Sequence, residues 1–118
     1  MKTALITGVS SGIGRAAAES LLRRSWFVYG SVRNATDAPP GVTPLLFDVT
    51  DAAAREQALA TVERPLDALV NNAGIAVPGP LLELTEDELR QQMEVNFFAP
   101  LAITKACREK LAPGAKAL

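Results

Sequence analysis

The sequence predicts an α/β fold, a doubly wound parallel sheet with helices on both faces. Two observations lead to this prediction. Short apolar runs, rich in β-branched and aromatic residues, alternate along the chain with longer segments of helical periodicity. The first apolar run is also followed directly by a glycine-rich turn and a helical pattern. Alternating strands and helices imply right-handed crossovers, so we expect the first four strands in the order 3-2-1-4.

The expected elements follow one another in a regular order. The strands are the apolar runs over residues 2–7, 26–32, 44–48 and 66–71. The helices begin at Ile13, at Thr50 or Asp51, and at Thr85, and they end near residues 24, 63 and 114. Thr85 and Glu88 have the spacing of a capping box at the start of the third helix.

One stripe of the third helix is mainly apolar, and its members are Leu89, Met93, Phe97, Leu101 and Thr104. The Pro113-Gly114 pair is expected to end this helix. Residues 115–118 then resemble the start of a fifth strand. A sheet that stopped at the fourth strand would expose an apolar edge, which favours aggregation. We therefore expect residues 1–118 to be the N-terminal part of a single domain, with the chain ending before strand five and the remaining strands missing from it.

The glycine-rich turn, Thr7-Gly8-Val9-Ser10-Ser11-Gly12-Ile13-Gly14, has the chemistry of a dinucleotide site. It joins a strand to a helix N-terminus, where unpaired amides carry partial positive charge and suit a pyrophosphate. Glycine lets the backbone turn tightly and approach the ligand. Glycines also mark ordinary turns, so the flanking strand and helix are what favour the dinucleotide interpretation.

Composition excludes several other classes of protein. The net charge is −1 with no basic block, so we expect no nucleic-acid partner. Cys107 is the only cysteine, which excludes an internal disulfide and fits a reducing compartment such as the cytoplasm. The chain has no histidine, and we expect no metal site. No apolar run approaches the roughly 20 residues that span a bilayer, so no membrane association is expected.

Four motifs in order make the chain resemble the short-chain dehydrogenase/reductase family, in its T-G-x-x-x-G-I-G subgroup. They are residues 7–14, Asp48-Val49, Asn71-Asn72-Ala73-Gly74 and Val95-Asn96. The resemblance covers all 118 residues and implies a Rossmann-type, dinucleotide-binding domain. Each motif has a plainer alternative: a strand end for Asp48, an ordinary turn for residues 71–74, and a solvated helix position for Asn96.

The resemblance implies a role for each motif. The cofactor's phosphates and ribose would be held by Gly8, Ser10, Ser11, Gly12, Ile13 and Gly14. The adenosine ribose would be lined by Asn72, Ala73 and Gly74. Asp48 would accept a hydrogen bond from the adenine amino group, with Val49 beside it. Asn71 resembles a brace within the sheet, and Thr7 resembles a tie between the first strand and its neighbour.

The resemblance also implies a catalytic role for Asn96, as one member of a tetrad of Asn, Ser, Tyr and Lys. Its backbone carbonyl would hold a water that connects to the lysine and relays protons. Pro100 lies four residues later and has no N–H to bond to that carbonyl, which leaves the acceptor free. Alternatively, Pro100 only kinks the helix or ends it near residue 99.

The choice between the two nicotinamide cofactors rests on the end of the second strand. NAD binding usually needs an acidic residue about 20 positions past the glycines. No Asp or Glu occurs between Leu21 and Thr36, Ser31 occupies the expected acidic place, and Arg33 follows it. A guanidinium can pair with the 2′-phosphate of NADP(H), which is the cofactor we expect. Alternatively, Arg33 is a solvated charge.

The expected function is an NADP(H)-dependent oxidoreductase that interconverts a small-molecule alcohol and carbonyl. Reduction requires a donor to the developing alkoxide, but the chain has no Tyr-x-x-x-Lys, and Tyr29 is expected only to pack. We therefore expect the chain alone to be inactive. The alternatives are a non-catalytic dinucleotide-binding module, or another enzyme on the same fold such as an epimerase or dehydratase. The third helix resembles the element that such enzymes use to form homo-dimers or homo-tetramers.

Overall fold

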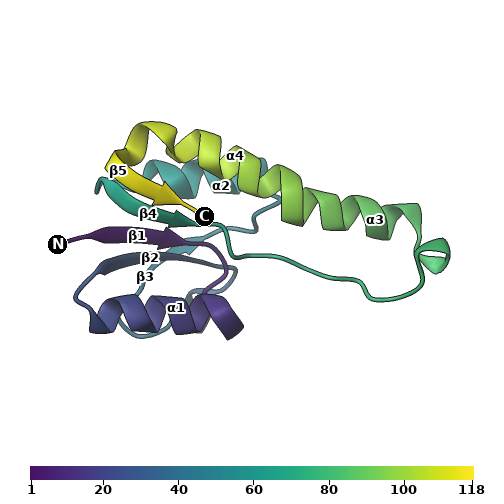
Figure 1. The fold of residues 1–118 in the computed structure, drawn as a ribbon, viewed down its shortest axis with the longest axis horizontal. Helices are drawn as coiled ribbons and strands as arrows, with labels where there is room; N and C mark the ends of the chain where they lie inside the picture. Colours follow the sequence, from purple (N-terminus) through teal and green to yellow (C-terminus); the bar gives the residue numbers. More distant parts are fainter.

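A computed structural model describes all 118 residues as a parallel sheet with helices on both faces (Figure 1). Its strands are β1 (Thr3–Ile6), β2 (Phe27–Val32), β3 (Thr43–Leu46), β4 (Leu66–Val70) and β5 (Leu111–Ala117). They lie in the order β3-β2-β1-β4-β5, and every pair is parallel. The predicted order of the first four strands is confirmed.

The helices alternate with the strands. They are α1 (Gly12–Arg23), α2 (Ala52–Ala60), α3 (Glu86–Met93) and α4 (Ala99–Cys107). A π-helical turn, Glu94–Phe98, joins α3 to α4, and 3-10 turns occupy Ala35–Asp37, Leu81–Glu83 and Arg108–Lys110. Helix α1 covers one face of the sheet, and α2 and α4 cover the other (Figure 1).

The core consists of two apolar clusters, one on each face of the sheet. Successive residues of a strand point to opposite faces, so Leu5 joins the cluster under α2 and α4 while Ile6 joins the cluster under α1. All four residues of β1 are buried, as expected for the central strand of a parallel sheet. Tyr29 is also buried and packs edge-on against Phe27 with ring centroids 5.0 Å apart, which confirms its packing role.

The fifth strand corrects the sequence analysis. The helix that was expected to reach Gly114 ends earlier, and β5 begins at Leu111. The register shifts between the pairs Leu66–Leu111 and Ala68–Lys116, which places Pro113 and Gly114 (φ +78°) in an irregular stretch of an edge strand. Such a position tolerates a residue without an N–H and one in the left-handed region. The expectation that the chain ends before strand five is therefore wrong.

The edge of β4 is covered by this strand. The ladder continues past β5, because the Leu118 amide donates to the Leu69 carbonyl (2.8 Å) and the Asn71 amide donates to the Leu118 carbonyl (2.7 Å). The apolar edge that would have favoured aggregation is thus paired within the chain. That residues 1–118 form the N-terminal part of one domain stays a prediction.

Helix α3 and the loop before it project beyond the sheet, and the molecule measures 49 × 27 × 24 Å (Figure 1). The predicted capping box is confirmed, since Thr85 Oγ1 accepts from the Glu88 amide at 3.1 Å and the Glu88 carboxylate accepts from the Thr85 amide at 3.4 Å. No helix is long and apolar enough to cross a membrane.

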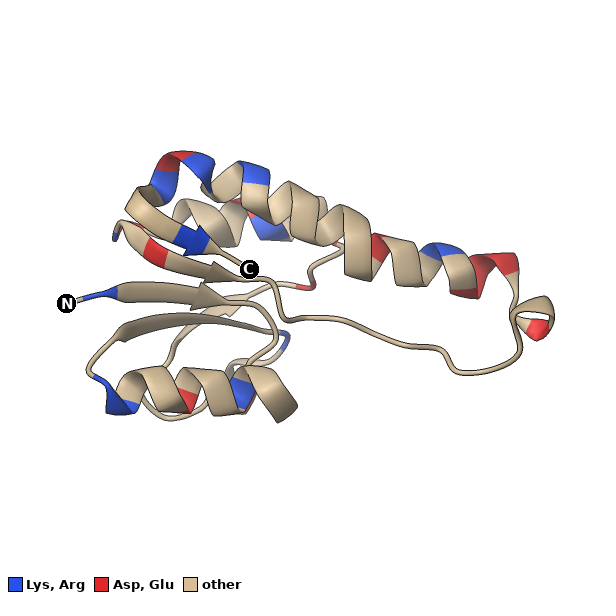
Figure 2. Cartoon of the chain, in the orientation of Figure 1, with Lys and Arg blue, Asp and Glu red and all other residues tan.

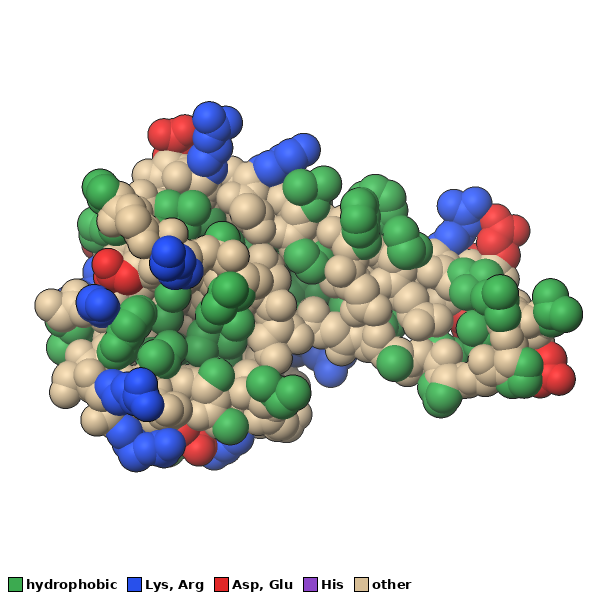
Figure 3. Space-filling view, viewed as in Figure 1, with side chains coloured by type: hydrophobic (Ala, Val, Ile, Leu, Met, Phe, Trp, Pro, Cys, Tyr) green, Lys and Arg blue, Asp and Glu red, His purple; other side chains and the backbone are tan.

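The helical segment buries a different stripe from the one that the sequence analysis singled out. Its buried positions, spaced four apart, are Val95, Ala99, Ile103 and Cys107. Much of the predicted stripe is exposed: Met93 (49%), Phe97 (54%) and Leu101 (45%), with Phe98 (50%) beside them. Hydrophobic side chains are visible along this part of the surface in Figure 3. The amphipathic pattern therefore has two apolar sides, only one of which packs on the sheet.

We expect Leu69→Ala to destabilise the protein by about 2–5 kcal/mol, because the fully buried side chain would leave a cavity in the larger cluster. Leu82→Ala is the matched control. Leu82 is 98% exposed, so its truncation should change the free energy of unfolding by less than about 0.5 kcal/mol. Urea unfolding measures both, and equal effects for the two variants would contradict this assignment of the core.

Candidate functional site

The N-terminus of α1 presents unpaired amides at the end of the glycine-rich turn. The N-cap residue, Ser11, is extended (φ −157°) and its side chain makes no capping hydrogen bond. The amides of Gly12, Ile13 and Gly14 make no hydrogen bond within the chain. The first turn of α1 carries no acidic residue, whereas that of α3 carries three, visible as the red start of that helix in Figure 2. The start of α1 therefore favours an anion from outside.

The turn is held from the β4 side by hydrogen bonds. Thr7 Oγ1 accepts from the amides of Asn72 (3.0 Å) and Ala73 (2.9 Å). The Asn72 side-chain amide donates in return to the carbonyls of Thr7 (3.1 Å) and Gly8 (3.0 Å). Thr7 therefore ties β1 to its neighbour, as the sequence analysis expected, and Asn72 braces the turn.

The start of α1 lies so close to this brace that only glycine fits at position 14. A Cβ at Gly14 would overlap the Gly8 carbonyl oxygen and the Asn72 side-chain nitrogen. Gly8 has a φ of +73°, in the left-handed region that favours glycine, and it also lies against Ala73. The two glycines thus have different roles. Gly8 allows the backbone to turn, and Gly14 allows α1 to approach that turn closely.

Arg33 and Asp48 lie at the carboxyl ends of neighbouring strands. Asp48 Oδ1 accepts from the Thr50 amide (2.9 Å) and the Thr50 hydroxyl (2.7 Å). These two hydrogen bonds hold the pKa of Asp48 below its usual value, with a further small lowering from Arg33, whereas partial burial opposes the shift. Asp48 is therefore an ionised acceptor at neutral pH.

A pocket of about 350 Å³ joins these elements at the carboxyl edge of the sheet, a size typical of small-molecule sites. Predicted site residues that line it are Gly8, Ser10, Ser11, Arg33, Asp48, Val49, Asn72, Ala73 and Gly74. Gly12, Ile13, Gly14 and Asn96 are predicted site residues that do not line it. The Ile13 side chain is 82% exposed, so any contact with a ligand would come from its backbone or from its outer face.

Six further lining residues were not among the predicted site residues: Ser31, Val32, Phe47, Ile75, Gln91 and Val95. Val32, Phe47 and Ile75 adjoin predicted site residues in the sequence, and Ser31 lies two positions before Arg33, so that proximity was the available signal. Gln91 and Val95 come from the third helical segment, far along the chain. Val95 belongs to the Val95-Asn96 motif, which was the available signal for it. No local pattern marks Gln91, because its place depends on how that segment packs.

Asn96 lies outside the pocket but holds one of its walls. Its Oδ1 accepts from the Ile75 amide (2.9 Å) and its Nδ2 donates to the Ile75 carbonyl (2.7 Å). The residue sits in the π-helical turn, a conformation frequent at functional sites. The helical path continues through Pro100 into α4, so the alternative in which Pro100 ends the helix is wrong. A π turn bonds residues five apart, which accommodates a proline that cannot bond four residues back.

Asn71 braces the sheet against a helix rather than against another strand. Its Nδ2 donates to Thr104 Oγ1 (3.1 Å), and that hydroxyl donates to the Pro100 carbonyl (2.8 Å). The contact links the start of the 71–74 motif to the segment that carries Asn96. The expected brace is present, but its partner is α4.

A comparison with family models matches residues 2–117 to the model described as short chain dehydrogenase. The chain belongs to the short-chain dehydrogenase family. Its strand order, glycine-rich turn and Asn71–Gly74 loop are thus those of a short-chain dehydrogenase, as the resemblance implied.

Known relatives of this short-chain dehydrogenase are longer than the chain. An NADPH-dependent 3-dehydrocapnine reductase from Ornithobacterium rhinotracheale is 42% identical over 117 residues, covering 89% of this chain and 41% of the relative. An alcohol dehydrogenase from Thermococcus sibiricus, solved with 5-hydroxy-NADP, superposes with a TM-score of 0.90 at 28% identity, covering 99% of this chain and 56% of the other.

A third similar protein is the NADPH-bound carbonyl reductase from chicken fatty liver. Its structure superposes with a TM-score of 0.83 at 26% identity, covering 93% of this chain and 51% of the other. The chain therefore spans about two fifths to just over half of the length of these three relatives.

We expect Gly14→Ala to destabilise the protein by about 3 kcal/mol, the upper end of the usual range for overpacking, because the methyl group has no room beside the Gly8 carbonyl and Asn72. Gly12→Ala is the matched control. A Cβ at Gly12 meets no atom within 4 Å, so only its φ of +61° opposes alanine, at about 1 kcal/mol. Thermal unfolding compares the two, and a Gly14→Ala variant as stable as Gly12→Ala would refute the close approach.

We expect Thr50→Val to raise the pKa of Asp48 toward the ordinary value of 3.8, because one donor to the carboxylate is lost while the Thr50 amide stays. Since the native pKa is depressed, Asp48 stabilises the fold above its unfolded pKa and loses this contribution as pH falls through the native pKa. The variant should therefore lose less stability on acidification.

The carboxyl ¹³C signal of Asp48, followed by NMR through an acid titration, measures this shift. Thr61→Val is the control, since that hydroxyl donates to the Ala58 carbonyl (2.6 Å) and not to Asp48. An unchanged Asp48 titration in Thr50→Val would show that the hydroxyl does not stabilise the carboxylate.

Proposed function

We propose that this chain is the cofactor-binding part of an NADP(H)-dependent oxidoreductase that interconverts an alcohol and a carbonyl by hydride transfer. The observation that carries the proposal is the single pocket in which the glycine-rich turn, Arg33, Asp48 and the 72–74 loop meet. Family membership supports hydride-transfer chemistry, and the named relatives support the class of reaction.

The residues fit a dinucleotide. The free amides at the start of α1 suit the pyrophosphate, because they bring donors and partial positive charge without a competing carboxylate. The ionised Asp48 suits the amino group of adenine. The backbone of Asn72, Ala73 and Gly74 would lie along the adenosine ribose. When bound, the nicotinamide ring of the cofactor supplies or accepts the hydride.

Arg33 supports NADP(H) over NAD(H). It is exposed and lines the pocket, and no acidic side chain precedes it on β2. A guanidinium pairs well with a phosphate, whereas the ribose 2′-hydroxyl of NAD(H) usually meets a carboxylate. The NADPH named for the relatives agrees with this assignment. The alternative that Arg33 is merely solvated predicts no selectivity.

Asn96 is proposed to serve the reaction through its backbone. Its side chain bonds both backbone groups of Ile75, and Pro100 withholds the usual α-helical donor to the Asn96 carbonyl, which leaves that carbonyl as an acceptor for a water. A water at this place would relay a proton without contact between Asn96 and the substrate.

None of the 118 residues is a credible proton donor to an alkoxide. Tyr29 is buried in the core, and burial raises the pKa of the Cys107 thiol, so neither acts as an acid in the pocket. We therefore expect these residues alone to bind the cofactor without turnover. The same observation favours the second candidate, a dinucleotide-binding module without chemistry.

Two further proposals concern the partners of the protein and the cellular compartment in which it works. The exposed side chains of Met93, Phe97, Phe98 and Leu101 would suit a homo-dimer or homo-tetramer formed along α3 and α4. The small-molecule substrate would enter from the same edge of the sheet as the cofactor.

The lone, buried Cys107 suits a reducing compartment such as the cytoplasm.

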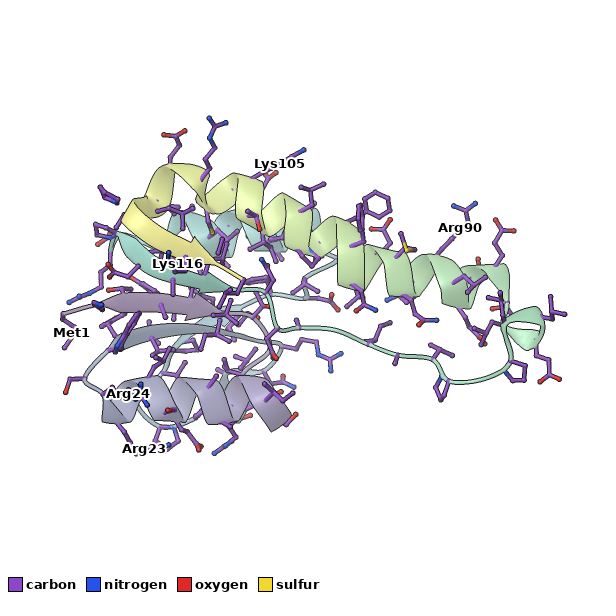
Figure 4. The ribbon with its side chains drawn as sticks, viewed as in Figure 1. Met1, Arg23, Arg24, Arg90, Lys105 and Lys116 are labelled. Carbon is purple, nitrogen blue, oxygen red and sulfur yellow. The ribbon has the colours of Figure 1, made fainter.

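We expect NADPH to bind about ten- to hundredfold more tightly than NADH, the range for a charge-assisted hydrogen bond pair. Arg33→Asp should reverse this preference, because a carboxylate repels the 2′-phosphate and accepts from a 2′-hydroxyl. Arg23→Asp is the charge-matched control, since Figure 4 shows Arg23 at the far end of α1 from the glycine-rich turn. Fluorescence titration measures the affinities of the wild-type protein and both variants for NADPH and for NADH.

The result decides between the alternatives for Arg33. A preference that Arg33→Asp leaves unchanged would show that another residue reads the 2′ position. A wild-type protein that binds neither dinucleotide would overturn the proposed function as a whole.

A further inference from the structure

We propose that Ser31 is a positioning residue, which holds the glycine-rich turn in its cofactor-binding form through a hydrogen bond to Gly8. The inference rests on the proposed function, because it assigns the turn to a dinucleotide. It differs from the expected role of this position, which the sequence analysis treated as the place of an acidic residue that would select NAD.

The contact is short and enclosed. Ser31 Oγ accepts from the Gly8 amide at 2.8 Å, and the Ser31 carbonyl accepts from the next amide, that of Val9, at 3.1 Å. One residue of β2 thus binds two consecutive amides at the start of the turn. Ser31 is only 3% exposed, so water competes weakly for the Gly8 amide.

Buried polar side chains are rare in this chain, and two of the three, Thr7 and Ser31, lie at the turn. The buried ones are Thr3, Thr7 and Ser31. Thr7 holds the turn to the 72–74 loop on the β4 side, and Ser31 holds it to β2 on the other side. The Gly8 carbonyl is already engaged by Asn72, so Ser31 completes the hydrogen bonding of the Gly8 peptide groups.

This arrangement predicts that loss of the hydrogen bond from Gly8 to Ser31 weakens the binding of NADPH and NADH equally. Gly8 is held at a φ of +73°, and a free Gly8 amide would let the turn adopt other conformations open to glycine. The turn would then need to be ordered on binding, which lowers affinity. The pyrophosphate that the turn would bind is common to NADPH and NADH, so Ser31 should affect affinity and not selectivity, in contrast to Arg33.

The test measures the dissociation constants of NADPH and NADH for wild-type protein, Ser31→Ala and Ser31→Thr. Ser31→Ala should weaken both cofactors by about five- to tenfold, the effect of one neutral hydrogen bond, with their ratio unchanged within twofold. Ser31→Thr keeps the hydroxyl and should restore binding. Ser20→Ala is the control, because Ser20 lies on α1 and makes no side-chain hydrogen bond in the structure.

A second readout needs no cofactor. The Gly8 amide should exchange with solvent faster in Ser31→Ala than in wild-type protein or Ser31→Thr, as followed by ¹H–¹⁵N NMR. Should Ser31→Ala fail to fold, Ser31→Cys gives the same two readouts, because a thiol nearly keeps the volume but accepts hydrogen bonds weakly.

The possible outcomes distinguish the role of Ser31 from the proposed function. Equal loss of both affinities with faster Gly8 exchange supports the role of Ser31. Unchanged affinities, or a changed ratio between the cofactors, overturn that role while leaving the proposed function in place. Failure of the wild-type protein to bind either cofactor overturns the proposed function and this inference with it.

Discussion

The close approach between the glycine-rich turn and the start of α1 is the constraint on which the rest of the site depends. Gly14 lies against the Gly8 carbonyl and the Asn72 side chain with no room for a Cβ. This contact sets where the first turn of α1 stands relative to the sheet, and with it the direction in which the free amides point. If α1 were displaced from the turn by the width of a methyl group, its free amides would no longer point to the same anion position. The anion site is therefore a product of packing as much as of helix chemistry.

The hydrogen bonds around Gly8 extend this constraint across the sheet. Thr7 and Asn72 connect the turn to the loop after β4, and Ser31 connects it to the end of β2. The pocket thus forms where the chain leaves β1 and β4 in opposite directions, the switch point at which open α/β sheets bind ligands. Asn96 adds a connection from outside the sheet, since it fixes Ile75 on the pocket wall.

The helical segment from α3 to α4 serves two surfaces at once. One stripe packs on the sheet through Ile103 and its neighbours, while Phe97 and Leu101 remain exposed. Charged side chains such as Arg90 and Lys105 point away from the sheet (Figure 4). The π turn changes the phase of the helix between these regions, because each residue in it advances less around the axis than in an α-helix. The segment can therefore hold Asn96 against the 72–75 loop and still pack α4 on β4.

The sequence by itself determined the glycine-rich turn and the capping box at Thr85, because each depends on residues close together in the chain. It also determined the order of the first four strands and the family, because the alternation of strands and helices and the order of the motifs can be read along the chain. The tertiary structure decided what depends on distant contacts. Residues 111–117 became a strand because β4 offers an apolar, hydrogen-bonding edge, although Pro113 and Gly114 are typical helix terminators. Ser31 became a buried acceptor because it binds the Gly8 amide, and Gln91 lines the pocket because its helical segment is held to the pocket wall through the contact of Asn96 with Ile75. Local sequence propensity does not predict these contacts between residues that are far apart in the chain.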